Sequence, residues 1–182
     1  GYEPSDLDGH TSVMARAWEL AVGNGIIGLQ GGGNSGYDED PSTHHLVTPA
    51  DAPGVITVGA ADPTGSVARF SSDGLVVAGV VKPELLAWGQ ANYTASPYDP
   101  DGYTTSGGTS MATPLLAGGV ACLLQMHPDW SLQEIREALR ASGSYFRQHG
   151  GPDPLFIQGY GLPDLSLAAG IPPGRIDDPR TP

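Results

Sequence analysis

The sequence is poor in cysteine and in basic residues. Cys122 is the only cysteine, so no disulfide can form within the chain. Its place in an apolar segment predicts a side chain packed in the core rather than a nucleophilic thiol. Lys and Arg number 8 against 20 Asp and Glu, which gives a net charge of −12. That balance excludes the basic surface that nucleic-acid binding requires.

The sequence also lacks a run of about 18 apolar residues, so no membrane span is predicted. It begins at Gly1 rather than Met, and no signal peptide is visible. We therefore expect a processed chain or a fragment. A length of 182 residues is enough for one domain with a substantial core. The 27 Gly and 17 Pro predict many turns, while 39% hydrophobic residues are sufficient for a folded domain.

The most informative stretch is 105–114, which reads Thr-Ser-Gly-Gly-Thr-Ser-Met-Ala-Thr-Pro and precedes an apolar run. Pro114 suits the first turn of a helix. Ser110 would then lie beside unpaired N–H groups at the positive end of the helix dipole. This position favours a nucleophilic hydroxyl, and the N–H groups can stabilise the oxyanion that forms when the hydroxyl attacks. The alternative is that Ser110 or Thr109 is only an N-cap. Helical spacing is shown by Leu115, Gly118, Gly119, Cys122, Leu123 and Met126.

Upstream, the pattern predicts a helix over 12–22 followed by a short buried strand over 26–30. The inner face of this helix would carry Val13, Ala17, Leu20 and Ala21. The segment 31–36, Gly-Gly-Gly-Asn-Ser-Gly, matches a dinucleotide fingerprint, but 37–45 is polar and has no helical period. We therefore reject a nucleotide site. Asn34 could aim its amide at an oxyanion, or simply occupy a tight turn.

Further strands are predicted over 55–58 and 75–80, a loop over 92–103, and a helix that begins with a capping box of Ser131 and Glu134. The acidic cluster Asp38, Glu39 and Asp40 could bind calcium, although such loops are usually only solvated. His44 and His45 are adjacent, lack the spacing of a helical metal pair, and receive no role.

The stretch 108–114 resembles the nucleophile motif of the subtilisin-like serine proteases, the subtilases. The segment 13–36 resembles the helix and strand that lead to the oxyanion-hole asparagine of that family. The resemblance implies that Ser110 is the nucleophile and Asn34 the oxyanion donor. It also implies substrate-binding positions at Gly31, Gly32, Gly33, Gly108 and Thr109. Lys82-Pro83-Glu84 resembles the family's Lys-Pro-Asp segment, whereas Trp88 departs from a proline common there.

The resemblance implies an α/β fold, a three-layer arrangement of a parallel sheet flanked by helices, incomplete at its N-terminal side. Residues 1–170 would be the C-terminal portion of a subtilase catalytic domain, and 171–182 a disordered tail. It implies a secreted serine endopeptidase that acts on polypeptides through an acyl-enzyme and requires no cofactor.

The Asp and His motifs of a catalytic triad are absent, and His10 lies in the wrong context to be the base. We expect both groups on an upstream segment, and the isolated chain to be inactive. The alternative is a non-catalytic subtilase-like binding or scaffold domain. The presence of both Ser110 and Asn34 favours the protease. Met111, beside the nucleophile, predicts sensitivity to peroxide.

Overall fold

The computed structural model describes residues 4–170, so the predicted tail at 171–182 lies outside the described residues. A short 3-10 helix, η1 (Pro4–Asp6), begins a segment expected to be a loop. The α-helices are α1 (Val13–Gly23), α2 (Thr109–Met126), α3 (Leu132–Ser142), α4 (Ser144–His149) and α5 (Leu165–Ala168). The strands are β1 (Leu29–Gly31), β2 (Ile56–Ala61), β3 (Val76–Val77), β4 (Val80–Val81), β5 (Leu85–Trp88), β6 (Asn92–Ala95) and β7 (Tyr103–Ser106).

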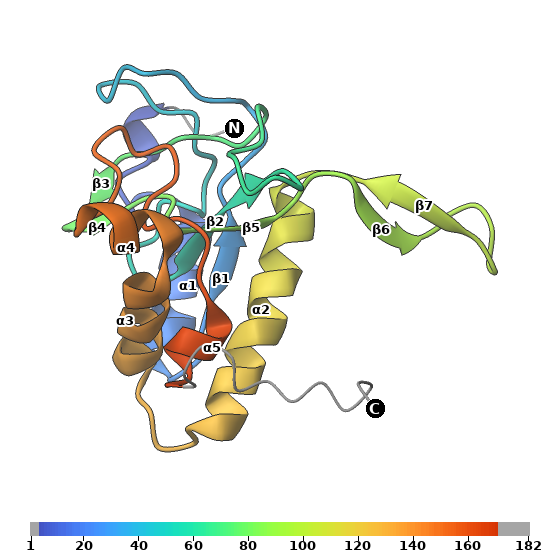
Figure 1. The fold of residues 1–182 in the computed structure, drawn as a ribbon. Coiled ribbons are helices and arrows are strands. Elements are labelled where there is room, and N and C mark those ends of the chain that lie inside the picture. Colours follow the sequence, from blue (N-terminus) through green and yellow to red (C-terminus); the bar gives the residue numbers. More distant parts are fainter. Residues whose placement is uncertain (1–3, 171–182) are drawn as a thin grey trace.

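The centre of the fold is a parallel sheet in the order β1-β2-β5, with helices packed on it (Figure 1). All six residues of β2 are buried, as expected of a parallel strand covered on both faces. One apolar cluster joins β2 and β5 to α2, α3 and α5, and a smaller cluster holds Ala15 of α1 against Val55. The predicted α/β architecture is confirmed.

The two edges of this sheet differ. Beyond β5, the segment at 160–161 continues the hydrogen bonding, because Tyr160 N–H donates to Glu84 and Leu86 N–H donates to Gly161. Beyond β1, no strand of the described part of the chain pairs with it. An unpaired strand edge favours the addition of another strand.

Helix α2 crosses the sheet and begins at the mouth of the cleft described below. Its buried residues are Thr109, Ala112, Leu116, Gly119, Val120 and Leu123. Leu115 and Met126 are about half exposed and Cys122 is exposed, so the prediction that Cys122 packs in the core was wrong. The apolar composition of α2 extends around the helix, and the sheet covers one side of it.

The same helix corrects two further expectations. Pro114 lies in the second turn rather than the first, because α2 begins at Thr109. Among the described residues, α2 alone has the length and mean hydropathy, 1.3, of a membrane span, so the prediction that no segment reaches this threshold was also wrong. A helix at the core of a globular domain meets the same criteria, and α2 packs against all three strands of the sheet.

Helix α1 is capped as its sequence suggests, since the Ser12 hydroxyl accepts from the Ala15 N–H. Its predicted inner face is wrong. Val13 and Leu20 are exposed, whereas Ala15 is buried and Trp18 packs toward Val55. The helix is apolar on two sides, so periodicity alone did not identify the side that meets the body.

Other boundaries differ from those predicted. The predicted strand at 26–30 begins only at Leu29, and the predicted strand at 75–80 is the hairpin β3-β4. The predicted loop at 92–103 contains β6, which pairs with β7 in a hairpin that stands away from the body (Figure 1). The capping box of Ser131 and Glu134 at α3 is confirmed.

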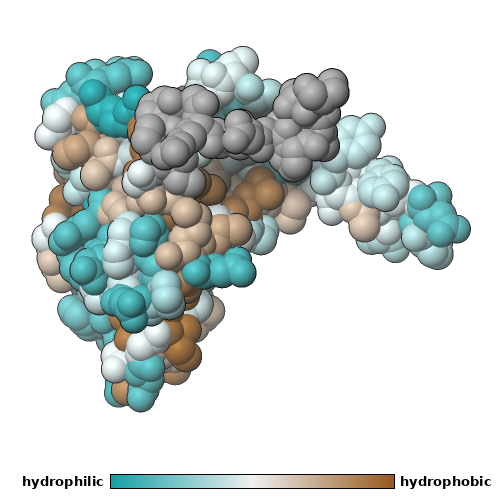
Figure 2. All heavy atoms as spheres, turned by 60° about the horizontal axis from the view of Figure 1, so that its bottom comes forward, coloured by the Kyte–Doolittle hydropathy of each residue, from teal (hydrophilic) through white to brown (hydrophobic). Residues whose placement is uncertain are grey.

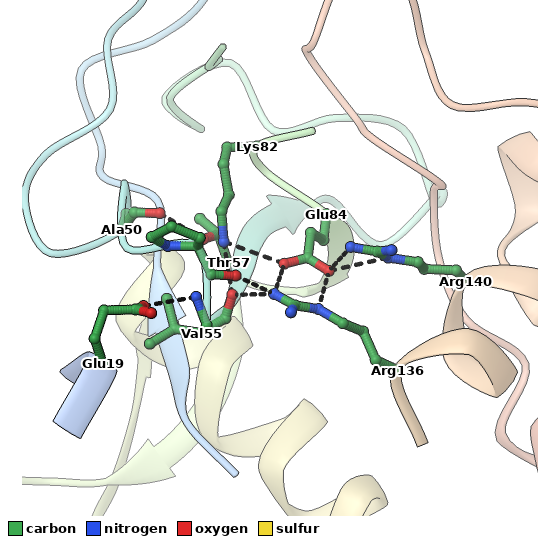
Figure 3. A network of polar contacts seen from close by, with 10 residues as sticks. Glu19, Ala50, Val55, Thr57, Lys82, Glu84, Arg136 and Arg140 are labelled. Carbon is green, nitrogen blue, oxygen red and sulfur yellow. Dashed lines mark hydrogen bonds and ion pairs between the residues drawn. The ribbon is translucent and has the colours of Figure 1, made fainter. Parts of the chain in front are cut away.

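A buried ionic cluster fastens α3 to the ends of β2 and β5 where these strands begin (Figure 3). The Glu84 side chain has no exposed surface and accepts hydrogen bonds from Lys82, Arg136 and Arg140. The carbonyl of Val55 accepts from Lys82 Nζ at 2.6 Å and from Arg136 at 2.7 Å. One carboxylate therefore faces three cations.

Burial and charge set the ionisation of this cluster. Burial lowers the pKa of Lys82 to about 8, although Glu84 partly opposes the shift. Burial alone would raise the pKa of Glu84, but the charges of Lys82, Arg136 and Arg140 outweigh it, and the pKa lies below its usual value. Glu84 therefore stays ionised at neutral pH and balances part of the positive charge.

Candidate active site

Three separate segments meet at a cleft of about 560 Å³. Strand β1 and the segment after it supply one wall, the first turns of α2 supply the opposite wall, and Val47 comes from the intervening loop. Asn34 and Ser110, 76 positions apart in the chain, therefore line the same cleft. The lining residues are Leu29, Gln30, Gly31, Gly33, Asn34, Val47, Thr109, Ser110, Thr113 and Pro114.

Thr109 connects the two walls. Its N–H donates to Asn34 Oδ1 at 2.8 Å, and its hydroxyl donates to the same oxygen at 3.2 Å. The Gly33 N–H in turn donates to Thr109 Oγ1 at 3.3 Å. A Cβ on Gly31 would lie 2.9 Å from this hydroxyl, so a side chain there would displace Thr109. The glycines let the wall approach α2 closely.

These bonds fix the direction of the Asn34 amide. Oδ1 is turned toward Thr109, which leaves Nδ2 as a donor, and no bond from Nδ2 is recorded within residues 4–170. Ser110 is exposed and is the second residue of α2, where backbone N–H groups have no partner inside the helix. Its N–H and hydroxyl likewise form no recorded bond in the described part of the chain.

Gly108 determines how the chain enters α2. It is the N-cap residue, so the interpretation of Ser110 or Thr109 as an N-cap is wrong. Its φ of +144° lies in a region that favours glycine. Its N–H donates to the carbonyl of Gly89 at 2.7 Å, which joins the start of α2 to the end of β5. The start of α2 is therefore held both by the segment after β1, through Asn34, and by the end of β5, through Gly89.

The five predicted substrate-binding residues differ in whether they reach the surface of the cleft. Gly31, Gly33 and Thr109 line the cleft, whereas Gly32 and Gly108 lie behind its surface and do not. Gly32 is buried between β2 and the loop, because its N–H donates to Val58 and its carbonyl accepts from Val47. Sequence reasoning missed Val47, since the loop at 37–52 has no period from which an inward side chain could be identified.

None of the five histidines lines the cleft, and all five lie within the described residues. His127 stacks on Trp130, and His149 stacks on Tyr145. His45 was given no role, yet its Nδ1 lies 2.6 Å from a carboxylate oxygen of the buried Asp73. The chain thus forms no Ser–His pair at the cleft in residues 4–170.

The acidic loop shows no sign of a metal centre. Asp38 accepts from the Asp40 N–H and the Thr43 hydroxyl, and Asp40 accepts from Ser42. The Ser42 side-chain and backbone bonds lower the pKa of Asp40. Among the described residues, no three Asp, Glu, His or Cys side chains gather in a group that could hold a metal ion. The carboxylates act here in local turns.

Comparison with known proteins agrees with this arrangement. Among curated proteins, the serine protease AprX of Bacillus subtilis is 36% identical over 148 residues, which cover 70% of this chain and 32% of AprX. Subtilisin E of Bacillus subtilis is 32% identical over 159 residues, covering 87% of this chain and 38% of that protein. The chain thus spans about a third of the length of these relatives.

Solved structures share the fold. The prenylagaramide maturation protease PagA has a TM-score of 0.67 at 27% identity, covering 85% of this chain and 54% of that one. The patellamide maturation protease PatG has a TM-score of 0.65 at 25% identity, and the match covers 84% of this chain and 46% of the PatG chain. The family model described as the subtilase family matches residues 3–161. The chain therefore belongs to the subtilase family of serine proteases.

Proposed function

We propose that this chain is the part of a secreted serine endopeptidase that carries the nucleophile and the oxyanion hole. The observation that carries the proposal is the convergence of Ser110 and Asn34 on one cleft, with the Asn34 amide held by Thr109. Neither side chain is buried, so neither takes part in the packing of the core. A scaffold would have no physical use for this pair.

In the proposed reaction, Ser110 Oγ attacks the carbonyl carbon of the scissile peptide bond. A histidine on an upstream segment takes the hydroxyl proton, oriented by an aspartate of that segment. The Ser110 N–H and Asn34 Nδ2 donate to the oxyanion of the tetrahedral intermediate. The C–N bond then breaks, the amine leaves with the proton from the histidine, and water hydrolyses the acyl-enzyme.

In this proposal the upstream segment packs at the unpaired edge of β1. The relatives are about three times as long as the matched region, and the exposed apolar face of α1 lies on a helix that precedes this strand. Without a base, Ser110 is an unactivated alcohol, so we expect the isolated chain to be a very weak catalyst. No residue of the cleft calls for a cofactor in this scheme.

Ser110→Ala in the protein joined to its upstream segment tests the proposal. We expect hydrolysis of a peptide substrate and labelling by a fluorophosphonate probe both to be lost, because each requires the Ser110 oxygen. Ser106→Ala, at the end of β7, is the matched control and should retain both. Unchanged turnover in Ser110→Ala would refute the nucleophile, and a wild-type protein that neither cleaves nor labels would favour the non-catalytic alternative.

A further inference from the structure

A second surface lies close to the cleft, on the other side of the start of α2. It is a groove of about 200 Å³ whose lining is almost entirely apolar. We call it the Trp88 groove. It is lined by Leu86, Ala87, Trp88, Leu115, Leu116, Leu162, Pro163 and Leu165. Trp88 and Leu115 are each about half exposed, at 50% and 51%.

The Trp88 groove is independent of the open edge of the sheet. Trp88 ends β5, which lies at the opposite edge from β1. A segment that extended the sheet from β1 would therefore leave this groove uncovered. Exposed aromatic and aliphatic side chains around a hollow are typical of a protein-binding site.

Trp88 is held as a rigid anchor. Its indole Nε1–H donates to the carbonyl of Gln90 at 2.6 Å, and its own carbonyl accepts from the Asn92 side chain at 2.9 Å. A side chain already fixed in its binding conformation loses little entropy when a partner binds.

The hairpin β6-β7 continues this surface. It stands clear of the body, with apolar residues on the body beside its root (Figure 2). Tyr93, Tyr98 and Tyr103 are 81%, 95% and 76% exposed. In the pairing register, Tyr93 faces Thr105 and Tyr103 faces Ala95, which places both tyrosines on one face of the hairpin. A two-stranded ribbon is only marginally stable alone, so a partner would stabilise it.

Charge identifies the partner. Residues 83–135 contain no Lys or Arg, while Asp99 and Asp101 lie at the tip of the hairpin and Asp164 lies beside Leu165. A second copy of this chain, with its net charge of −12, would bring like charges together. A segment with an aliphatic anchor flanked by Lys or Arg would fill the groove and face both the carboxylates and the tyrosine rings.

We propose that the Trp88 groove and the hairpin form an exosite for a basic, apolar segment of the polypeptide substrate, outside the cleft. The exosite rests on the proposed protease function. It adjoins the nucleophile, because Gly89 follows Trp88 and accepts from the Gly108 N–H, two residues before Ser110. Leu115 follows Ser110 by five residues on α2, a rise of about 7.5 Å along the helix axis. One polypeptide can therefore occupy both sites.

Binding of a decapeptide of alternating Leu and Lys to the Ser110→Ala chain tests the exosite, with a Leu and Glu peptide as its counterpart. We expect micromolar binding of the basic peptide only. Trp88→Ala should weaken it about tenfold or more, and Trp88→Phe should restore most of it. Asp99→Asn with Asp101→Asn should weaken it severalfold, whereas Asp129→Asn, distant in sequence and exposed, should not.

Three outcomes would overturn the exosite. They are Trp88→Ala binding the basic peptide as tightly as the unchanged chain, equal binding of the basic and acidic peptides, and a dimer of the chain that buries the groove. In the protein joined to its upstream segment, Trp88→Ala should raise KM about tenfold for a substrate that carries the basic segment and leave its kcat unchanged. For short substrates that lack the segment, neither KM nor kcat should change. If that protein is inactive but Trp88-dependent binding persists, only the proposed protease function fails. If it is active and KM does not change, only the exosite fails.

Discussion

Replacing Glu84 by Gln should destabilise the fold more than any other change of one charge. Gln keeps the shape of the side chain but removes the negative charge that faces Lys82, Arg136 and Arg140. Lys82 is fully buried and the Arg136 side chain is 9% exposed, so water cannot replace the carboxylate. The amide group would also turn an N–H toward cations that have only donors.

The expected magnitude follows from the cost of leaving buried charge without a partner. Removing one member of a buried ion pair costs about 3–5 kcal/mol. We expect about 4 kcal/mol here, a large share of the roughly 5–15 kcal/mol by which domains are stable. With a urea m-value of about 2 kcal/mol per molar, the unfolding midpoint should fall by about 2 M.

Urea unfolding of the chain, followed by circular dichroism, measures this shift. Glu137→Gln is the matched control, since Glu137 lies exposed on α3 and should change stability by less than about 0.5 kcal/mol. Lys82→Met should also have a small effect, because Arg136 still donates to the Val55 carbonyl and Met needs no solvation of charge. A midpoint for Glu84→Gln within 0.3 M (about 0.6 kcal/mol) of the unchanged chain would refute the reasoning.

Three more predictions concern titration and the cleft. The pKa of Lys82 is about 8 in the folded chain and 10.5 for an ordinary lysine, so between pH 8 and pH 10.5 the unfolded chain binds more protons than the folded one. The free energy of unfolding therefore rises with pH in this window, by about 3 kcal/mol at most. Urea unfolding at pH 7.5 and at pH 10.5 should show this rise in the unchanged chain and not in Lys82→Met, and an equal rise in both proteins would contradict the prediction. Asn34→Ala, in the protein joined to its upstream segment, should lower kcat by about 10²–10³-fold, the size known for the oxyanion-hole asparagine of subtilisin, with little change in KM; a change confined to KM would point to substrate binding instead. Peroxide should reduce the activity of the same protein through sulfoxide formation at Met111, and Met111→Leu should resist it; full activity after mass spectrometry shows Met111 oxidised would reject this.

The sequence predicted the elements whose local chemistry is self-contained. The capping box of Ser131 and Glu134 depends on residues within one turn, and it forms as predicted. The rejection of a nucleotide site also depended on local pattern, since no helix lies between Gly36 and β2. The candidate site residues came from the family resemblance, and the fold brings Ser110 and Asn34 to one cleft.

The sequence could not predict features that depend on what packs against an element. Val13 and Cys122 lie on helices that are apolar on more than one side, and only the tertiary structure decides which side is covered. Val47 reaches the cleft because its N–H bonds to Gly32 across the fold, which no local pattern signals. The pair His45 and Asp73 joins residues 28 apart through a loop without periodicity.

The hydrogen bonds from Thr109 to Asn34 have a consequence for the timing of catalysis in the proposed reaction. They orient the carboxamide before any substrate arrives, so its dipole need not rotate when negative charge appears on the acyl oxygen. Water around a free peptide must reorganise at that moment, and this work forms part of the uncatalysed barrier. The energy of alignment is here supplied once, when the chain folds, and each later turnover uses it without further cost.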